Sequence, residues 1–561
     1  MGLESSTNSS LDGKSFSKVH EQKPDPSSPS IEQKGTCTSP IHAEKMYDRN
    51  DIVYTEGARF WCIFATVAIM MFIVNFELSV VNTTLVAIVD DIGGFDSVSW
   101  VVSAYLLGYV GAIVILSKFS DIFGRKLILL LSIVVFIIFS AACAAAQTMV
   151  QLCVFRGFQG LGGGGCWALS TIYVIEMVPP ERYAKFLQHV STANALALLC
   201  GPIVGGAIAT NTTWRWIFIM NVPICVPAFI VAFLAIPHGF PYGDKPSYLR
   251  KAGLKKSLAR IDMLGTVLIL FATLALTSGF EEADKKFPWK SGYVISLLTI
   301  SGLLWVALCL WERHVTLSNG VREPVLPWRF FKDRQMVGIL LNTIFLGGPT
   351  VVSIFTLPQR FQLVYGLSGL DAGVRLIPFT ALIPIGSAFG SRISGRFKIP
   401  CVYLMLIGSI MQIIGFAFLG TLPKTLTIPT RTYGLEVLAG FGCGINFLML
   451  LMMIPLVTAE MDNAVGMGAG SQFRMIGSSM ILAISTSVFN TYARPELQKL
   501  LGMSDTDALS ELLPTLTPAL QEQVRLILAE GYNRQILVLC VSAAAQIPCT
   551  LLMWKKKQIT L

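Results

Sequence analysis

Two long apolar runs are separated by the short charged stretch Ser117-Lys118-Phe119-Ser120-Asp121-Ile122-Phe123-Gly124-Arg125-Lys126. It is too short for a domain linker, and its basic residues cannot enter hydrocarbon without a large cost. Lys and Arg collect in short cytoplasmic loops, so the stretch predicts a turn that joins two membrane-spanning helices on the cytoplasmic side. A small residue at 117 lets helix ends approach closely, Asp121 can cap or pair within the turn, and Gly124 allows the bend.

The composition is that of an integral membrane protein. Hydrophobic residues make up 53% of the chain and charged residues only 14%, whereas soluble domains carry about 25% charged residues. The net charge of +9 lies mainly in short loops beside apolar runs, where it sets topology, so we expect no nucleic-acid partner. The cysteines are mostly inside apolar segments and show no paired spacing typical of zinc sites or a disulfide framework.

Apolar runs long enough to cross a bilayer, about 20 residues each, recur from Phe60 to the end of the chain. They predict an all-α protein with fourteen transmembrane helices and both termini on one side. The expected spans lie near 60–86, 97–117, 127–146, 150–175, 187–209, 215–236, 262–281, 292–312, 336–358, 373–391, 401–420, 432–458, 470–490 and 534–554.

The loop charges alternate as this count requires. Loops after the second, fourth, sixth, eighth and tenth expected helices are rich in Lys and Arg, whereas the loop after the first contains Asp90, Asp91 and Asp96 and no basic residue. Because basic loops stay in the cytoplasm, both termini are predicted to be cytoplasmic. One outer loop, with Lys285, Lys286 and Lys290, departs from the pattern, although acidic residues dilute its charge.

An internal repeat divides the chain. Gly390 to Arg396 follows the tenth helix as the opening stretch follows the second, and Gly440 to Gly444 resembles the glycine run Gly157 to Gly165.

Pro518 to Glu530 has amphipathic helical spacing and is predicted to lie over the outer mouth. The expected segments are a disordered cytoplasmic tail (1–54), an N-terminal six-helix half (55–236), a cytoplasmic linker (237–261), two inserted helices (262–312), a cytoplasmic loop (313–335), a C-terminal six-helix half (336–554) with a long outer loop (491–533), and a cytoplasmic tail (555–561).

Two ionisable residues lie inside predicted spans. A carboxylate such as Glu77 is costly at membrane depth and normally marks a proton or substrate route; alternatively, the helix is shifted and Glu77 reaches the outer headgroups. Arg156 requires a carboxylate, carbonyls or water, and the glycines that follow it allow close helix packing; alternatively, Arg156 anchors a helix end. Both are candidates for proton coupling.

The fifth helix carries a glycine and proline motif. Gly201 and Gly205 are four residues apart, Gly206 is adjacent, and together they form one flat face. Pro202 removes a backbone hydrogen bond and bends the helix. The motif predicts a hinge in a tight interface, and a role in packing alone is the alternative.

Polar residues inside the remaining spans are candidates for lining a substrate cavity, although each could instead hydrogen-bond helix to helix. The surrounding sequence is apolar and aromatic, which suits bulky amphiphilic organic molecules. Asn211 begins a glycosylation sequon on a short outer loop close to the membrane. The cavity candidates are Asn82, Gln159, Asn194, Asn221, Gln362, Asn446, Gln472 and Arg474.

The stretch from Ser117 to Lys126 resembles the signature Gly-x-Leu-x-Asp-Arg-x-Gly-Arg-Lys of the major facilitator superfamily, which joins that family's second and third helices. Ser117 replaces the leading glycine. The matching residues are Asp121, Gly124, Arg125 and Lys126.

Further motifs resemble the fourteen-helix drug:proton antiporters of that superfamily. In the first-helix signature, Glu77 stands where the family usually has Asp, and Val86 replaces a Pro. Arg156 begins a segment similar to the family's Arg-x-x-Gln-Gly-x-Gly motif, whose Arg is implicated in proton coupling. Gly201 to Gly206 matches Gly-Pro-x-x-Gly-Gly, which is associated with antiporters rather than symporters. Trp214 to Pro223 resembles a further segment of the same family, particularly of its fungal multidrug and secondary-metabolite exporters.

The resemblance implies two parallel six-helix halves with a substrate site between them near the midplane. It implies a proton-driven exporter of hydrophobic or amphiphilic molecules that needs no cofactor besides the proton gradient. Its expected partners are the lipid bilayer, protons and a small-molecule substrate. We expect a monomer in the plasma membrane or, alternatively, the vacuolar membrane. The rival functions are uptake symport of a siderophore or nutrient and a non-transporting sensor; an enzyme is not favoured, since the sequence has no metal-ligand spacing or nucleotide-binding loop.

Overall fold

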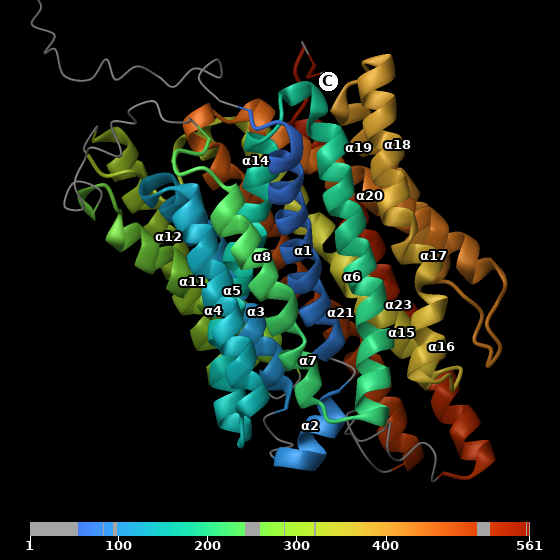
Figure 1. Cartoon of the computed structure of the whole chain (residues 1–561). Helices are drawn as coiled ribbons and strands as arrows, with labels where there is room; N and C mark the ends of the chain where they lie inside the picture. Colours follow the sequence, from blue (N-terminus) through green and yellow to red (C-terminus); the bar gives the residue numbers. More distant parts are fainter. Residues whose placement is uncertain are drawn as a thin grey trace, which may run out of the picture. The chain divides into compact units, whose positions relative to one another are not determined.

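The computed structural model describes residues 54–81, 84–93, 98–241, 258–284, 287–318, 321–501, 516–556 and 558–559. Tyr47–Leu561 forms one compact unit. The described residues are almost entirely helical (Figure 1), and their β-structure is limited to the isolated bridges Ile261↔Glu323 and Ala283↔Phe287. Helices dominate because a backbone in lipid must satisfy its hydrogen bonds within the segment.

The N-terminal half contains α1 (Gly57–Val80), α2 (Leu85–Ile92), α3 (Ser99–Phe123), α4 (Arg125–Ala145), α5 (Met149–Glu176), η4 (Pro180–Arg182), α6 (Tyr183–Asn211), α7 (Arg215–Ile219) and α8 (Asn221–Ala235). The inserted pair is α11 (Met263–Glu282) and α12 (Gly292–Leu317).

The C-terminal half contains α13 (Arg329–Lys332), α14 (Arg334–Gly347), the π-helical turn η5 (Gly348–Val352), α15 (Ser353–Leu363), α16 (Gly369–Arg375), α17 (Ile377–Thr380), α18 (Leu382–Phe397), α19 (Cys401–Leu419), α20 (Arg431–Val457), η6 (Glu460–Asp462), α21 (Asn463–Leu501) and α23 (Pro518–Leu552).

Eleven helical stretches among the described residues are long and apolar enough to cross a membrane. Three more stretches, namely α5, α21 and the series α16 to α18, follow in sequence between those spans. With 28 and 39 residues, α5 and α21 exceed the roughly 20 residues that a crossing needs. Together these elements are consistent with the expected fourteen crossings.

Two boundaries differ from the sequence-based expectation. The first span was expected over 60–86, but α1 ends at Val80, and Asn82 lies outside the described residues. The stretch 491–533 was expected to be a loop, whereas α21 continues to Leu501 and α23 begins at Pro518.

The second difference has a clear physical reason. Pro518 to Glu530 is the first part of a helix that runs on to Leu552, so it is not a separate helix across the mouth. Ala493 and Leu497 of α21 pack with Val524 and Leu528 of α23 in one buried apolar cluster. These contacts stabilise both helices beyond the expected ends of their spans.

The glycine runs of the two halves make equivalent contacts. A Cβ added to Gly160 of α5 would lie 2.1 Å from the carbonyl oxygen of Tyr105 in α3. In the other half, a Cβ on Gly444 of α20 would lie 2.0 Å from the carbonyl oxygen of Ile383 in α18. Helices therefore pack backbone to backbone at both places, and this agrees with the internal repeat found in the sequence.

The inserted pair contacts both halves. Helix α11 packs against α3 of the N-terminal half and α21 of the C-terminal half, as well as against α12. Ser103 of α3 donates to Glu281 at 3.2 Å, and Gln472 of α21 donates to Thr273 at 2.8 Å. The insertion is thus in direct contact with both repeats.

Candidate functional site

A buried ion pair joins α1 to α5. Nη1 of Arg156 lies 2.6 Å from Oε1 of Glu77, and both side chains are 0% exposed. The Arg156 Nε donates to the carbonyl oxygen of Val101 at 2.9 Å, and its Nη1 donates to Gln159 at 2.7 Å. Two charges inside a protein are tolerated only when they are paired and hydrogen-bonded, and these contacts meet that requirement.

Other helices complete the network. Asn221 donates from Nδ2 to Oε2 of Glu77 at 2.7 Å, and Gln159 donates from Nε2 to Ser140 of α4 at 2.8 Å. The Tyr105 ring of α3 lies 4.2 Å from Cζ of Arg156. The pair is therefore enclosed by side chains from α3, α4 and α8.

Asn221 reaches the ion pair because the helical segment is interrupted immediately before this residue. Helix α7 ends at Ile219, Met220 forms a turn, and α8 starts at Asn221. Pro223 has no backbone N–H to donate to the carbonyl of Ile219, which favours a break at this point. The sequence thus places an amide at the start of a helix in the bundle interior.

The side chains of Glu77 and Arg156 are both completely enclosed by protein. Arg156 Nη2 and Asn221 Oδ1 are buried without a hydrogen-bond partner among the described residues. The network therefore has unused donors and acceptors, and protonation of Glu77 would remove the negative charge that holds Arg156.

The charged turn between α3 and α4 is also an ion-paired structure. Arg125 pairs with Asp121 at 2.5 Å and with Glu176 at the end of α5 at 2.7 Å. Gly124 has a φ of +100°, a backbone conformation that favours glycine. Lys126 Nζ donates to the carbonyl oxygens of Phe233 and Ile236, both at 2.7 Å.

Ser117 lies where the two halves meet. A Cβ on Gly468 of α21 would lie 2.5 Å from Ser117 Oγ. Both positions must therefore be small, and the close contact at Ser117 is with α21 rather than with the helix that follows the turn. The Ser117 hydroxyl donates to the carbonyl oxygen of Ile113 within α3 at 2.8 Å.

Lys118 connects this turn to the loop after the inserted helices. Its Nζ lies 2.6 Å from Glu323, which also pairs with Arg260. Burial alone would raise the pKa of Glu323, but the charges of Lys118 and Arg260 hold the pKa of this loop carboxyl below its ordinary value. Glu323 is therefore a stable anion between two cations at neutral pH.

The glycine motif of α6 lies next to the buried pair. A Cβ on Gly201 would lie 2.5 Å from Cβ of Ser79, two residues beyond Glu77, so α6 packs closely against α1 there. Gly205 is buried, whereas a Cβ on Gly206 would meet no atom within 4 Å. The tight contact is thus at Gly201, and the Pro202 side chain lies outside the described part.

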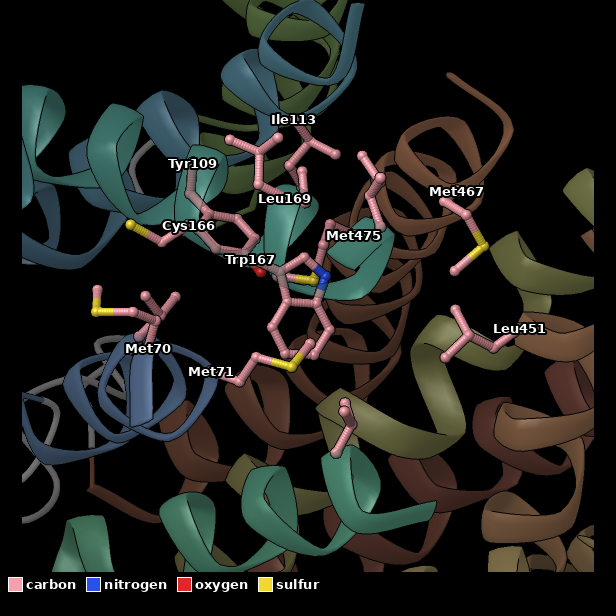
Figure 2. Close-up of a cluster of buried hydrophobic side chains, with 14 of the residues drawn as sticks. Met70, Met71, Tyr109, Ile113, Cys166, Trp167, Leu169, Leu451, Met467 and Met475 are labelled. Carbon is pink, nitrogen blue, oxygen red and sulfur yellow. The ribbon is translucent and has the colours of Figure 1, made fainter. Parts of the chain in front are cut away.

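A small cavity of about 20 Å³ lies between the two halves, which is room for about one water molecule. Trp167 of α5 lines it from the N-terminal half, and Phe447 of α20 and Arg474 of α21 line it from the other. In Figure 2 the Trp167 indole lies among methionine side chains, including Met71 and Met475, and all belong to one buried cluster.

The remaining polar candidates lie elsewhere. Gln472 donates to Thr273 of the inserted helix α11, and Asn446 donates to Ser409 and Gln546 within the C-terminal half. These contacts favour the helix-to-helix alternative for both residues.

Two further cavity candidates, Gln362 and Asn194, and the sequon residue Asn211 are not part of the cavity lining. Gln362 is exposed near the end of α15. Asn194 of α6 has a buried Oδ1 with no partner among the described residues. Asn211 is the last residue of α6, is exposed, and donates to the carbonyl oxygen of Ala207 at 2.9 Å.

Several buried charges were not selected from the sequence, and two of them, Glu436 and Arg360, interact electrostatically in the C-terminal half. Glu436 of α20 is 0% exposed and Arg360 of α15 is 2% exposed. Both carboxylate oxygens of Glu436 lack a partner among the described residues, and Arg360 donates to the carbonyl oxygen of Leu419 at 3.3 Å. Glu436 is the one charged residue within its expected span, 432–458, and this signal could have identified it, whereas Arg360 lies just beyond the expected span 336–358.

Comparison with known proteins agrees with this architecture. The model of the Major Facilitator Superfamily matches residues 67–482. The MFS-type transporter FPY5 of Fusarium mangiferae is 36% identical over 498 residues, which cover 88% of this chain and 83% of that protein. The efflux pump FUS6 of Gibberella fujikuroi is 28% identical over 448 residues, covering 79% of this chain and 78% of that protein.

Among solved structures, a bacterial homologue of the human lysosomal transporter Spinster, in an inward-facing conformation, has the same fold. Its TM-score is 0.56 at 13% identity, and the match covers 90% of this chain and all of that one. The matched family region includes the Glu77–Arg156 pair, the charged turn and the cavity residues. The chain is a membrane transporter that belongs to the Major Facilitator Superfamily.

Proposed function

We propose that this transporter exports hydrophobic or amphiphilic small organic molecules in exchange for protons. The observation that carries the proposal is the fully buried Glu77–Arg156 pair with its Asn221 and Gln159 hydrogen bonds. A fully buried carboxylate whose charge is balanced by one neighbouring cation has two arrangements, one ionised and one protonated. Such a group can couple proton binding to a change between access states.

The coupling would act through the helices that hold the pair. Protonation of Glu77 would leave Arg156 without its anion, so Arg156 would seek other acceptors and the contacts between α1 and α5 would change. Gly201 packs α6 against α1 close to Glu77, so a shift of α1 would reach the proposed hinge helix. Coupling of a few kcal/mol is sufficient to bias such an equilibrium.

The substrate would bind between the halves around Trp167. Methionine side chains adapt to differently shaped apolar partners, and Met71 and Met475 flank the indole (Figure 2). The cavity would have to widen to admit a bulky molecule, which is what opening toward either side of the membrane achieves. The names of the fungal relatives, one of them an efflux pump, support export.

The test uses purified protein in sealed liposomes with an imposed pH gradient. The wild type should move an amphiphilic dye toward the acidic compartment, and Glu77→Gln should lose this movement while still exchanging dye across the membrane without a gradient. Glu496→Gln is the matched control, because Glu496 is an exposed carboxylate of α21 paired with Lys499. Full proton-driven transport by Glu77→Gln would refute the assignment.

The same assay separates the rival functions. An uptake symporter would carry the dye in the direction of proton flow, and a sensor would bind it without moving it. We further propose that the transporter acts in the plasma membrane as a monomer with both termini in the cytoplasm, in keeping with the alternation of basic loops.

A further inference from the structure

We infer that the cavity between the halves takes organic anions, with Arg474 as the counter-charge for an acidic group on an otherwise apolar substrate. This inference rests on the proposed export function and specifies its substrate class. The acid would be a carboxylate or a similarly delocalised anion attached to an aromatic or aliphatic body.

Arg474 lies deep within the membrane-spanning bundle. It is eleven residues beyond Asn463, the first residue of α21, which corresponds to about 16 Å along the helix. Its side chain is 9% exposed and lines the cavity. Arg474 is therefore a buried cation in the space between the two halves, where substrates of this fold bind.

Unlike Arg156, Arg474 has no carboxylate partner in the described part of the chain. Its Cζ lies 5.8 Å from the Trp167 ring centroid and 5.4 Å from that of Phe447. Cation–π contacts with two rings offset only part of the cost of leaving a charge unpaired in the protein interior. The site is thus electrostatically incomplete, and an anion would complete it.

The surrounding polar groups favour the same ligand. Trp167 Nε1 is a buried donor without an acceptor among the described residues. The described cavity lining includes no Asp or Glu. Donors around an apolar space, without a competing carboxylate, match an acceptor-rich anion on a hydrophobic body.

The backbone at Arg474 is held by close contacts. A Cβ on Gly347 of α14 would lie 2.3 Å from the carbonyl oxygen of Arg474, so the two backbones are in close contact. Ser478 donates to the same carbonyl oxygen at 2.9 Å. Because Trp167 belongs to one half and Arg474 to the other, an anion that contacts both would link the halves during the transport cycle.

The test compares acids with their neutral counterparts. Binding of naphthaleneacetic acid, indoleacetic acid and a medium-chain fatty acid, each paired with its primary amide, is measured calorimetrically on the full-length protein in nanodiscs. The wild type should bind at least one acid about tenfold more tightly than its amide, and Arg474→Gln should bring that ratio close to one. Arg474→Lys, which keeps the charge, should retain part of the preference and controls for folding.

Arg534→Gln is the matched control, since Arg534 is a half-exposed cation of α23 paired with Glu530. An acid-to-amide ratio near one for all pairs on the wild type, or an unchanged ratio in Arg474→Gln, would overturn the inference. Flux in liposomes distinguishes this failure from failure of the proposed function. Proton-driven export of the amides without any preference for acids would support the export function and refute the anion site. Arg474-dependent acid binding without flux would support the anion site and refute the export function.

Discussion

Among single residues, the buried charges of this transporter differ in whether they have an oppositely charged partner. Glu77 and Arg156 could both be recognised in the sequence, because each is a lone charge in an apolar run. Their pairing could not, since they are far apart in the chain and meet only when α1 packs on α5. The role of Asn221 was even less visible, because it depends on the break between α7 and α8.

The pair makes a prediction about stability. Arg156→Met should destabilise the protein by about 3–5 kcal/mol, because it leaves the Glu77 carboxylate buried without its cation. Adding Glu77→Gln should recover much of the loss, since the uncompensated charge is then gone. Denaturant unfolding of the two single variants and the double variant in detergent measures this coupling. Additive losses would mean that the two side chains do not depend on each other.

At the scale of helices, glycine positions determine how closely elements pack. The runs around Gly160 and Gly444 indicated close helix contacts from the sequence alone. The partners could not be predicted, because nothing local specifies α3 or α18 as the facing helix. The extensions of α21 and α23 were missed because the chain there is too polar to look like a span, although Leu497 and Leu528 still pack together.

Alanine substitution tests these packing contacts. Gly160→Ala and Gly444→Ala should each lower the thermal stability of the detergent-solubilised protein, because the new methyl group would press against a backbone carbonyl about 2 Å away. Gly434→Ala is the control on the same helix, α20, because a Cβ at Gly434 would meet no atom within 4 Å. Alanine favours helices over glycine by about 1 kcal/mol, so Gly434→Ala should be neutral or stabilising. Equal effects at all three positions would contradict the packing account.

At the scale of the whole transporter, the inserted helices are tied to both halves. Sequence patterns predicted the insertion and its basic flanking loops, but not that Lys118 of the charged turn pairs with Glu323 beyond α12. We expect the Lys118–Glu323–Arg260 cluster to favour the state in which this end is closed, because it joins the charged turn of the N-terminal half to the segments that flank the inserted helices. That link requires Glu323 to be ionised.

The pH dependence of this cluster follows from the lowered pKa of Glu323. A carboxyl with a depressed pKa stabilises the structure above its ordinary pKa, near 4.3, and the stabilisation is lost as the pH falls through the lowered value. Glu323→Gln should therefore open, at neutral pH, the end of the transporter that carries the charged turn. The measurement is the rate at which a membrane-impermeant thiol reagent labels Ser471→Cys, which should increase. Lys118→Gln should act similarly, and the double variant should show little further effect. Labelling that is unchanged in both single variants would rule out a gating role.

The central claim is that Glu77 exchanges the proton that drives transport. The most direct measurement is proton movement itself, recorded with a pH-sensitive dye inside liposomes when substrate is added to the outside without any initial gradient. For the wild type, the account predicts proton movement opposite to the substrate, and for Glu77→Gln it predicts substrate movement with no proton signal. An undiminished proton signal from Glu77→Gln would contradict it.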